Sequence, residues 1–418
     1  MSDLTITDID RTVVRLPYRD VPRPNMDRWI PHWRYSEITE VTVEIGPTGV
    51  GETMLYYTWG TTEDEDVERA LGANAMDLLW DDDLGAGLQM ALFDAVGRGL
   101  DVPARRLLGT QVRDRVPLSW WAMDMPAEDW LAEAERAIDE GYTELKVKGR
   151  PWWDLREVVA TLSEELPAWF GIDIDFNETL LDAERALPIL EELEQYPQVE
   201  TFESPIPQED VPGSRQLCAE LDTPIAYHYG RPPGPVSLRM DLCDGFVLNQ
   251  GAEATMRQGA AVDAVDKPLW LQLVGSGITT AFAVQFGSVL DAARWPAITC
   301  YQLYEETLVE SEFDVEDGEV AVPDGPGLGV RLDRDAVDRL AVDRPDEQPR
   351  PECLVRTTFE NGRELYFATG YQMQRHAERG EFPFYERDVT TEVLPLDSEE
   401  RQDLHERAAE EPVRINPF

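Results

Sequence analysis

Hydrophobic and polar positions alternate near the start of the chain and then change to a helical period. Residues 38–45 read Ile-Thr-Glu-Val-Thr-Val-Glu-Ile, and apolar residues also recur between Leu4 and Val14. This alternation predicts strands on either side of a polar, aromatic loop at 22–34. Residues 63–108 follow a helical period. We therefore expect an α+β capping domain over residues 1–114.

After residue 114 the pattern becomes a series of short apolar segments, most of them followed by an amphipathic segment. Predicted helices separate most of the predicted strands, which lie at 116–123, 143–148, 171–175, 199–203, 224–227, 245–248, 269–274 and 297–301. This alternation predicts an α/β fold, a (β/α) barrel over residues 115–332. Reactive side chains of such barrels lie at the C-terminal ends of the strands.

The remaining residues, 333–418, show little of the barrel pattern. A turn-rich stretch at 320–330 with prolines and glycines precedes them. Residues 382–385, Phe-Pro-Phe-Tyr, are expected to pack on the body of the protein, and the charged residues 398–411 predict a solvated helix. We expect this part to return to the cap and then to form an extension.

Charge changes the picture of possible partners. The chain of 418 residues has 83 acidic and 37 cationic residues, a formal net charge of −46, yet 42% of its residues are hydrophobic. The hydrophobic content indicates a folded protein, and the charge repels nucleic acid and anionic membranes. No apolar run approaches the length of a membrane span, and residues 1–10 do not resemble a signal peptide, so we expect a cytoplasmic protein.

Lysine is scarce in this chain. It occurs only at Lys146, Lys148 and Lys267, whereas the other cationic residues are arginines. Extreme acidity with few lysines is typical of proteins adapted to molar salt, and we predict an extreme halophile as the source. Arginine cannot replace a lysine that must lose its proton, so the pair at 146 and 148 is the first candidate for chemistry. The four cysteines are far apart, which favours buried thiols over disulfides or zinc ligands.

Ionisable residues recur at the ends of successive predicted strands. In chain order these are Lys146 and Lys148, Asp173 and Asp175, Glu203, and His228. Alternation places the two lysines on one face of their strand and the two aspartates on one face of theirs. If these faces point inward, carboxylates and ammonium groups meet at one mouth, where carboxylate oxygens suit Mg²⁺ and a neighbouring lysine can act as a base.

These residues occur within a longer set of motifs that resembles the enolase superfamily, in its mandelate racemase and muconate lactonizing branch. The resemblance covers residues 4–332, and its motifs are Gly51-Glu52, Ala91-Leu-Phe-Asp94, Gly99–Pro103, Leu107-Leu-Gly109, Lys146-Val-Lys148, Asp175-Phe-Asn177, Phe202-Glu-Ser-Pro205, Pro224-Ile-Ala226 and Pro323–Gly329. It implies a modified (β/α)7β barrel with an α+β cap, and a Mg²⁺ that holds a substrate carboxylate while a base removes the α-proton.

The resemblance also implies roles for individual residues. Lys148 matches the base, Lys146 its partner, and Asp175 and Glu203 the first two metal ligands. The third carboxylate ligand is absent, and His228 stands at or beside its position. Imidazole can bind a divalent ion but favours softer metals, so Mn²⁺ is possible besides Mg²⁺, with His228 as ligand or acid.

The opposite face lacks the base that the family places there. Asn249 ends the sixth predicted strand and Gln272 the seventh, and amides do not exchange protons near neutral pH. We expect these two side chains, with Asn177, to contact the substrate.

The cap is expected to determine specificity. Its loop carries Trp29, His32 and Arg34, and Tyr56 and Tyr57 follow Gly51-Glu52. Aromatic faces with an arginine suit a polyhydroxy acid, through stacking and bidentate carboxylate binding. His32 is a candidate acid that reaches in from the cap.

Two classes of function remain open at this point. The first is a metal-dependent lyase that dehydrates a hydroxy or sugar acid to a 2-keto-3-deoxy acid, with a racemase or epimerase as the alternative enzyme. The second is a non-catalytic relative that lost its third metal ligand. The retained lysine pair favours an enzyme that acts on a small carboxylate, and the resemblance implies a homodimer or homo-octamer.

Overall fold

The N-terminal part of the chain forms an antiparallel sheet against which one helix packs closely. The computed structural model describes residues 4–44, 46–57, 59–310 and 313–416. The sheet has the order β1-β2-β3, and its cover is α4. A Cβ atom at Gly51 would collide with the backbone of α4 at Gly87, so glycine in β3 permits this close approach. The elements of this part are β1 (Ile6–Arg15), α1 (Arg23–Trp29), η1 (Pro31–Arg34), β2 (Tyr35–Val43), β3 (Gly49–Met54), α2 (Asp64–Ala70), α3 (Ala75–Leu78), η2 (Asp82–Leu84), α4 (Ala86–Gly99) and α5 (Arg105–Leu108).

Parallel strands then form the barrel that the sequence pattern predicts. Within the described residues they make a seven-stranded sheet in chain order, from β5 to β11. Residues 297 and 298 form parallel bridges to Leu118 and Gln272, next to the two edge strands, and so close the sheet. The strands are β5 (Trp120–Trp121), β6 (Glu144–Lys148), β7 (Gly171–Asp175), β8 (Val199–Glu203), β9 (Ile225–His228), β10 (Gly245–Leu248) and β11 (Leu269–Leu271).

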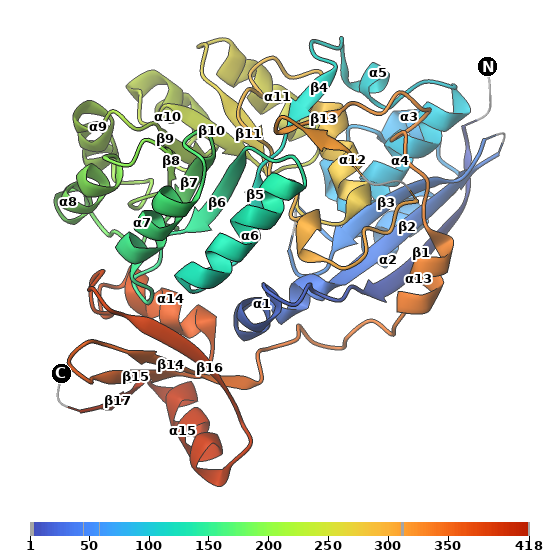
Figure 1. The fold of residues 1–418 in the computed structure, drawn as a ribbon. Helices are drawn as coiled ribbons and strands as arrows, with labels where there is room; N and C mark the ends of the chain where they lie inside the picture. The colour runs from blue at the N-terminus through green and yellow to red at the C-terminus, as the bar shows by residue number, and fades with distance from the viewer. Residues whose placement is uncertain (1–3, 45, 58, 311–312, 417–418) are drawn as a thin grey trace.

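Helices cover the outside of this barrel (Figure 1). They are α6 (Ala127–Asp139), α7 (Leu155–Glu165), α8 (Ala183–Leu193), α9 (Val211–Glu220), α10 (Gly234–Met240), α11 (Ala252–Asp263) and α12 (Gly277–Gly287). The expectation of a modified (β/α)7β barrel with an α+β cap is confirmed. A small antiparallel sheet beside the barrel contains β4 (Arg115–Pro117), β12 (Val315–Glu316) and β13 (Glu319–Ala321), and the short helix η3 (Tyr301–Leu303) follows the barrel's closing segment.

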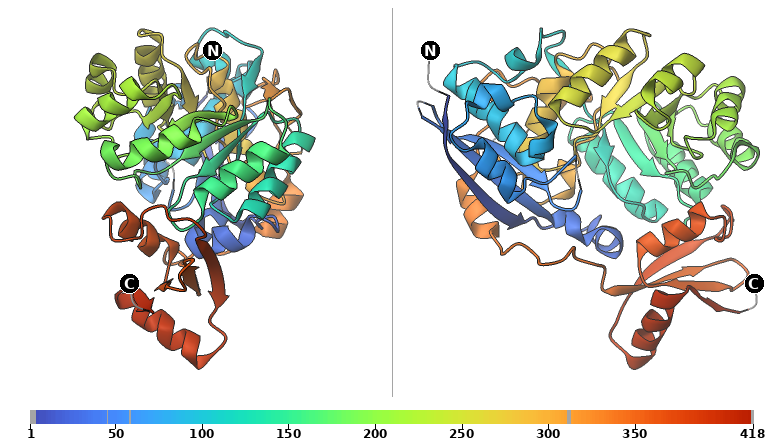
Figure 2. Two further views of the ribbon diagram at one scale, coloured as in Figure 1. Left: turned by 60° about the vertical axis from the view of Figure 1, so that its left-hand side comes forward. Right: turned by 180° about the vertical axis from the view of Figure 1, so that it is seen from behind.

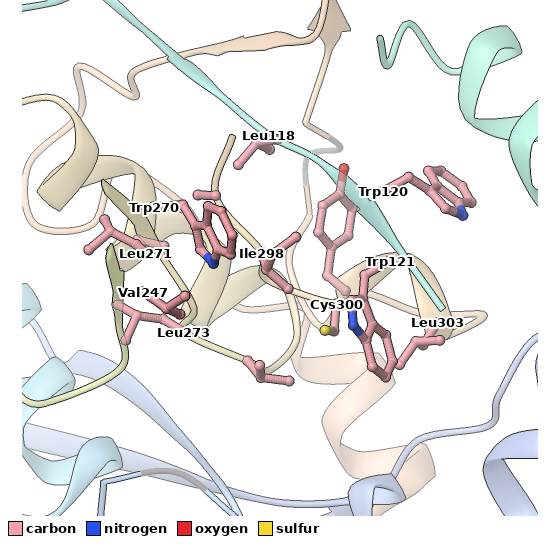
Figure 3. Close-up of a cluster of buried hydrophobic side chains, with 14 of the residues drawn as sticks. Leu118, Trp120, Trp121, Val247, Trp270, Leu271, Leu273, Ile298, Cys300 and Leu303 are labelled. Atoms are coloured by element: carbon pink, nitrogen blue, oxygen red, sulfur yellow. The ribbon is translucent and has the colours of Figure 1, made fainter. Parts of the chain in front are cut away.

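Large apolar side chains fill the barrel interior. Figure 3 shows Trp121, Trp270, Ile298 and Cys300 in one cluster, with Trp120 leaving β5 in a different direction from Trp121. All four cysteines are free, which agrees with the predicted thiols. No helix in the described ranges is long and apolar enough to cross a bilayer.

A buried carboxylate joins the cap to the barrel. Glu52 of β3 accepts hydrogen bonds from the backbone N–H and hydroxyl groups of Ser276 and Thr279, at 2.8–3.2 Å. These donors belong to the first turn of α12, where the helix dipole favours a negative charge. Glu52 therefore fixes the position of the cap over the barrel.

The C-terminal residues form a separate small domain, which the sequence pattern does not predict. A helix, α13 (Arg334–Leu340), first packs beside β1. An antiparallel sheet of order β16-β14-β15-β17 follows, with one helix on each side. Figures 1 and 2 show it below the barrel, with α14 turned toward the barrel and α15 away from it. Its elements are β14 (Cys353–Thr358), β15 (Glu364–Phe367), α14 (Gly370–Glu378), β16 (Thr390–Pro395), α15 (Glu399–Glu410) and β17 (Val413–Ile415).

Two smaller expectations for this region are confirmed. The charged segment at 398–411 forms the helix α15, which is largely exposed. Residues 382–385 pack on the body of the protein: the hydroxyl of Tyr385 donates to the carbonyl of Gly149, at 2.8 Å.

Candidate active site

Neighbouring barrel strands bring the predicted ionisable residues together at their C-terminal ends. In register, Lys148 of β6 pairs with Asp175 of β7, and Asp175 pairs with Glu203 of β8. His228 ends β9, the next strand. Residues at one level of a parallel sheet project their side chains to the same face, so these groups lie at one mouth of the barrel.

Lys146 is sealed inside the barrel. Its ammonium group pairs with Glu203, each side chain being 1% exposed, and lies 3.8 Å from the centre of the Trp270 ring. Burial opposes the charge, but the carboxylates of Glu203 and Asp173 outweigh it and raise the lysine pKa. Lys146 therefore stays protonated and serves as a fixed positive charge.

Lys148, unlike Lys146, is accessible from the cavity above the barrel. Its side chain is 11% exposed, and its Nζ lies 2.5 Å from Asp175 Oδ2 and 3.4 Å from Asn177 Oδ1. Of the three lysines, only Lys148 lines the cavity above the barrel. A group that takes a proton from a bound molecule must reach it directly, so Lys148 is the better placed of the pair.

Glu203 lies between two cationic or potentially cationic groups. Lys146 contacts one carboxylate oxygen, and His228 Nε2 lies 3.1 Å from the other. Burial favours the neutral acid, but Lys146 and His228 hold the pKa of Glu203 well below its usual range. Glu203 is therefore a carboxylate at neutral pH, and His228, whose side chain is 26% exposed, lies between it and the cavity.

The carboxylates of Asp175 and Glu203 are ligands of the type that a divalent metal such as Mg²⁺ prefers. Glu203 Oε1 is buried and has no well-aligned hydrogen bond, as expected of an oxygen kept for a ligand. No group of three or more His, Cys, Asp or Glu side chains in the described ranges is arranged to hold a metal. Mg²⁺ commonly uses one or two carboxylates and completes its shell with water and substrate. The residues present therefore fit such an open site.

A cavity of about 220 Å³ opens over these groups. Trp29, Trp33, Tyr57 and Trp121 supply aromatic walls, and Lys148, Arg150, Asn177, His228 and Gln272 supply polar groups. A second hollow of about 250 Å³ adjoins it through Tyr57 and Gln272, and Tyr56 and Asn249 line this second hollow. Several of the sequence-predicted residues thus lie in or beside one pocket.

Arg150 is a cavity residue that sequence reasoning missed. It is buried, donates to the backbone oxygen of Asp175 at 3.2 Å and also contacts Asn177. Its Nε has no hydrogen-bond partner. A guanidinium with an unused donor, which remains charged, suits a carboxylate or hydroxyl group in the cavity. Its position two residues after Lys148 was the available clue, but arginine is common in this chain.

Two cap residues lie apart from the cavity, contrary to expectation. The guanidinium of Arg34 pairs with Asp27 and covers the ring of Tyr18, so packing of the loop turns it away. His32 is buried, with Nδ1 3.2 Å from Gln348 Nε2, and burial lowers its pKa to about 4. Neither residue lines the cavity. At neutral pH His32 is uncharged and is not placed to act as the acid.

The position of the expected second base holds an amide. Gln272 follows β11 and donates to the hydroxyl of Tyr57, at 3.1 Å. Among the residues that the structure describes, Lys148 is the cavity-lining amine and His228 the cavity-lining imidazole. The site therefore has one amine base and an imidazole beside the carboxylates.

Comparison with known proteins agrees with this architecture. A family model described as enolase C-terminal domain-like matches residues 129–230 and 239–336. D-xylonate dehydratase of Haloferax volcanii is 26% identical over 82% of this chain and 94% of its own. N-succinylamino acid racemase of Thermus thermophilus is 28% identical over 62% of this chain and 71% of its own.

Solved structures show the same fold. Muconate lactonizing enzyme from Pseudomonas fluorescens superposes with a TM-score of 0.67 at 22% identity, covering 81% of this chain and 100% of its own. The family match ends at residue 336, before the C-terminal domain begins with β14. Together with the strand-end residues of the barrel, these matches show that the chain belongs to the enolase superfamily, in its mandelate racemase and muconate lactonizing branch.

Proposed function

We propose that this protein is a metal-dependent lyase that removes the α-proton of a sugar acid and eliminates water to give a 2-keto-3-deoxy acid. The observation that carries the proposal is the asymmetry of the site: Lys148 is an amine at the cavity wall, and the amide of Gln272 lies where a second base is expected. One base is sufficient for elimination, whereas inversion of a carbon centre needs a second group to return the proton.

A divalent cation, Mg²⁺ or Mn²⁺, belongs to this proposal. Asp175 and Glu203 would hold it, with His228 or water completing the shell. When bound, it supplies positive charge that stabilises the anion formed as the α-proton leaves. Lys146, which remains protonated beside Glu203, adds a fixed positive charge to the same region.

The remaining steps belong to residues of the chain. Arg150 binds an anionic or hydroxyl group of the substrate, and Asn177 and Gln272 orient its hydroxyls. Lys148 takes the α-proton. His228 can donate a proton to the β-hydroxyl, which then leaves as water. The resulting enol becomes the 2-keto acid.

The substrate class follows from the walls and from one relative. Aromatic faces beside several hydrogen-bonding side chains suit a chain of hydroxylated carbons with a carboxylate at one end. The relative named D-xylonate dehydratase covers more of this chain than the racemase does. We propose an aldonic acid as substrate and a homo-oligomer, dimer or octamer, as the assembly.

A screen of aldonic acids tests this proposal. D-xylonate and other five- and six-carbon acids are incubated with the protein in molar KCl with Mg²⁺ or Mn²⁺, and 2-keto acid formation is measured. Metal titrations of wild type, Asp175→Asn and His228→Ala accompany the screen, with Asp241→Asn, at an exposed surface pair, as control. Keto acid with one of these acids supports the proposal. No metal binding by wild type at millimolar concentration would favour a non-catalytic relative.

A further inference from the structure

The C-terminal domain reaches the same cavity as the candidate base. Tyr371 and Gln374 of α14 line it together with Lys148 and Arg150. They come from a part of the chain that begins after residue 336, where the family match ends. This wall of the site is therefore an addition of the present chain to the matched barrel.

The contact between α14 and the cap is close and aromatic. Tyr371 stacks on Trp29 with ring centres 5.6 Å apart, and Trp29 stacks on Trp152 at 5.7 Å. A Cβ atom at Gly370 would collide with the Trp29 ring, so glycine lets the start of α14 lie directly on it. Rings from the C-terminal domain, the cap and the barrel thus form one stack beside the cavity.

The domain is also attached to the loop that follows Lys148. The Tyr385 hydroxyl donates to Gly149 O at 2.8 Å, and the Thr391 hydroxyl donates to Trp152 O at 2.7 Å. The backbone N–H of Asp388 donates to Asp154, at 2.8 Å. These bonds hold α14 in a fixed place relative to the base, so its side chains form a defined wall.

We infer that the C-terminal domain is a second cap, in which the Tyr371 ring and the Gln374 amide contact the end of the substrate away from Lys148 and determine its length. The cavity has room for a short chain, and an amide can both donate to and accept from hydroxyl groups. The identity of the ligand rests on the proposed function, but the position of the wall does not.

Because the chain has only three lysines, chemical modification of Lys148 can test, without any ligand, whether Tyr371 and Gln374 limit access to the cavity. Lys146 is sealed, whereas Lys148 and Lys267 are 11% and 17% exposed. Acetic anhydride is applied in molar KCl, and the ratio of acetylation at Lys148 to that at Lys267 is measured by peptide mass spectrometry. Tyr371→Ala and Gln374→Ala should raise this ratio several-fold. An unchanged ratio in both variants would overturn the inference.

The control comes from the far side of the same domain. Gln402→Ala removes a glutamine of α15 that bonds Leu396 O and does not line the cavity, so it should leave the ratio unchanged. Tyr371→Phe keeps the stacked ring and should also leave it near the wild-type value. Equal increases in Gln402→Ala and Tyr371→Ala would show general loosening of the domain and would contradict a specific wall.

Binding then tests selection of length. Dissociation constants of five- and six-carbon aldonic acids are measured by quenching of tryptophan fluorescence. Tyr371→Ala and Gln374→Ala should weaken the preferred acid about ten-fold, the equivalent of one lost stacking or hydrogen-bonding contact, and reduce discrimination between lengths. Unchanged constants would overturn the inference and leave the lyase proposal standing. If wild type binds none of these aldonic acids, the lyase proposal is refuted. The acetylation ratio would still show whether Tyr371 and Gln374 form a wall of the cavity.

Discussion

Replacement of Lys146 by methionine isolates the buried charge pair of the site. Methionine keeps an unbranched apolar stem against Trp270 but removes the ammonium that compensates Glu203. Because both side chains are only 1% exposed, Glu203 cannot turn to water when its partner is lost. The variant therefore leaves an uncompensated carboxylate inside the barrel.

The size of the effect follows from this burial. Removal of one partner from a buried pair costs about 3–5 kcal/mol. His228 remains 3.1 Å from Glu203 and offsets part of the loss, so we expect a decrease of about 3 kcal/mol in the free energy of unfolding at pH 7. The matched control is Lys267→Met, whose partner Asp241 is 81% exposed, and this change should cost less than about 1 kcal/mol.

Urea unfolding in molar KCl, followed by tryptophan fluorescence, measures both variants. In wild type the pKa of Glu203 is depressed, so the stability from its pairing is present above the unfolded carboxyl pKa, about 4.3, and is lost as pH falls further. Without Lys146, burial raises the pKa of Glu203. The difference in unfolding free energy between wild type and Lys146→Met should therefore become smaller as the pH falls from 7 to 4. The double variant Lys146→Met/Glu203→Gln should regain most of the loss. Equal stability of Lys146→Met and Lys267→Met at pH 7 would show that the buried position of the Lys146–Glu203 pair does not determine the cost of losing the lysine.

Three further predictions concern stability. Burial depresses the pKa of His32 to about 4, so the folded state binds this proton less readily than the unfolded chain. The free energy of unfolding should therefore fall by up to about 3 kcal/mol as the pH drops from 6.5 to 4. Urea titrations should show a smaller pH dependence in His32→Gln and the wild-type dependence in the control His405→Gln. Glu52→Gln replaces a charged acceptor of the Ser276 and Thr279 N–H groups and should lower the unfolding free energy by about 2 kcal/mol, whereas an unchanged urea midpoint would contradict its docking role. With a formal charge of −46, the thermal midpoint should fall between molar and 0.1 M KCl, and an unchanged midpoint would contradict the predicted adaptation to salt.

Short-range patterning was sufficient to predict the barrel. The predicted strands at 171–175, 199–203 and 245–248 have the observed bounds, because each is a short segment in which Ile, Val, Thr or Phe favours a strand. The meeting of Lys148, Asp175 and Glu203 followed from strand alternation and from parallel strands ending at one edge. These are local rules that a single sequence carries.

Contacts between distant segments were not predictable in the same way. Arg34 lies in the expected loop, yet its direction depends on pairing with Asp27 and packing on Tyr18. The strands of the C-terminal domain were missed because they are buried on both faces: Leu354 and Tyr366 belong to one apolar cluster, and Val355, Leu365 and Phe367 to the main core. Such strands lack the alternation of apolar and polar residues that marks a half-buried strand. Tyr371 reaches the cavity only through the docking of that whole domain.

Proton NMR of candidate aldonic acids, incubated in D₂O with wild type and with Lys148→Arg, tests whether Lys148 is the single base of an elimination. Wild type should form a 2-keto-3-deoxy acid and the variant should show no turnover, because guanidinium stays charged and cannot accept the proton. Turnover by Lys148→Arg at the wild-type rate would contradict the assignment of Lys148 as the base. Recovered substrate with deuterium and inverted configuration, without keto acid, would contradict the elimination and indicate an epimerase.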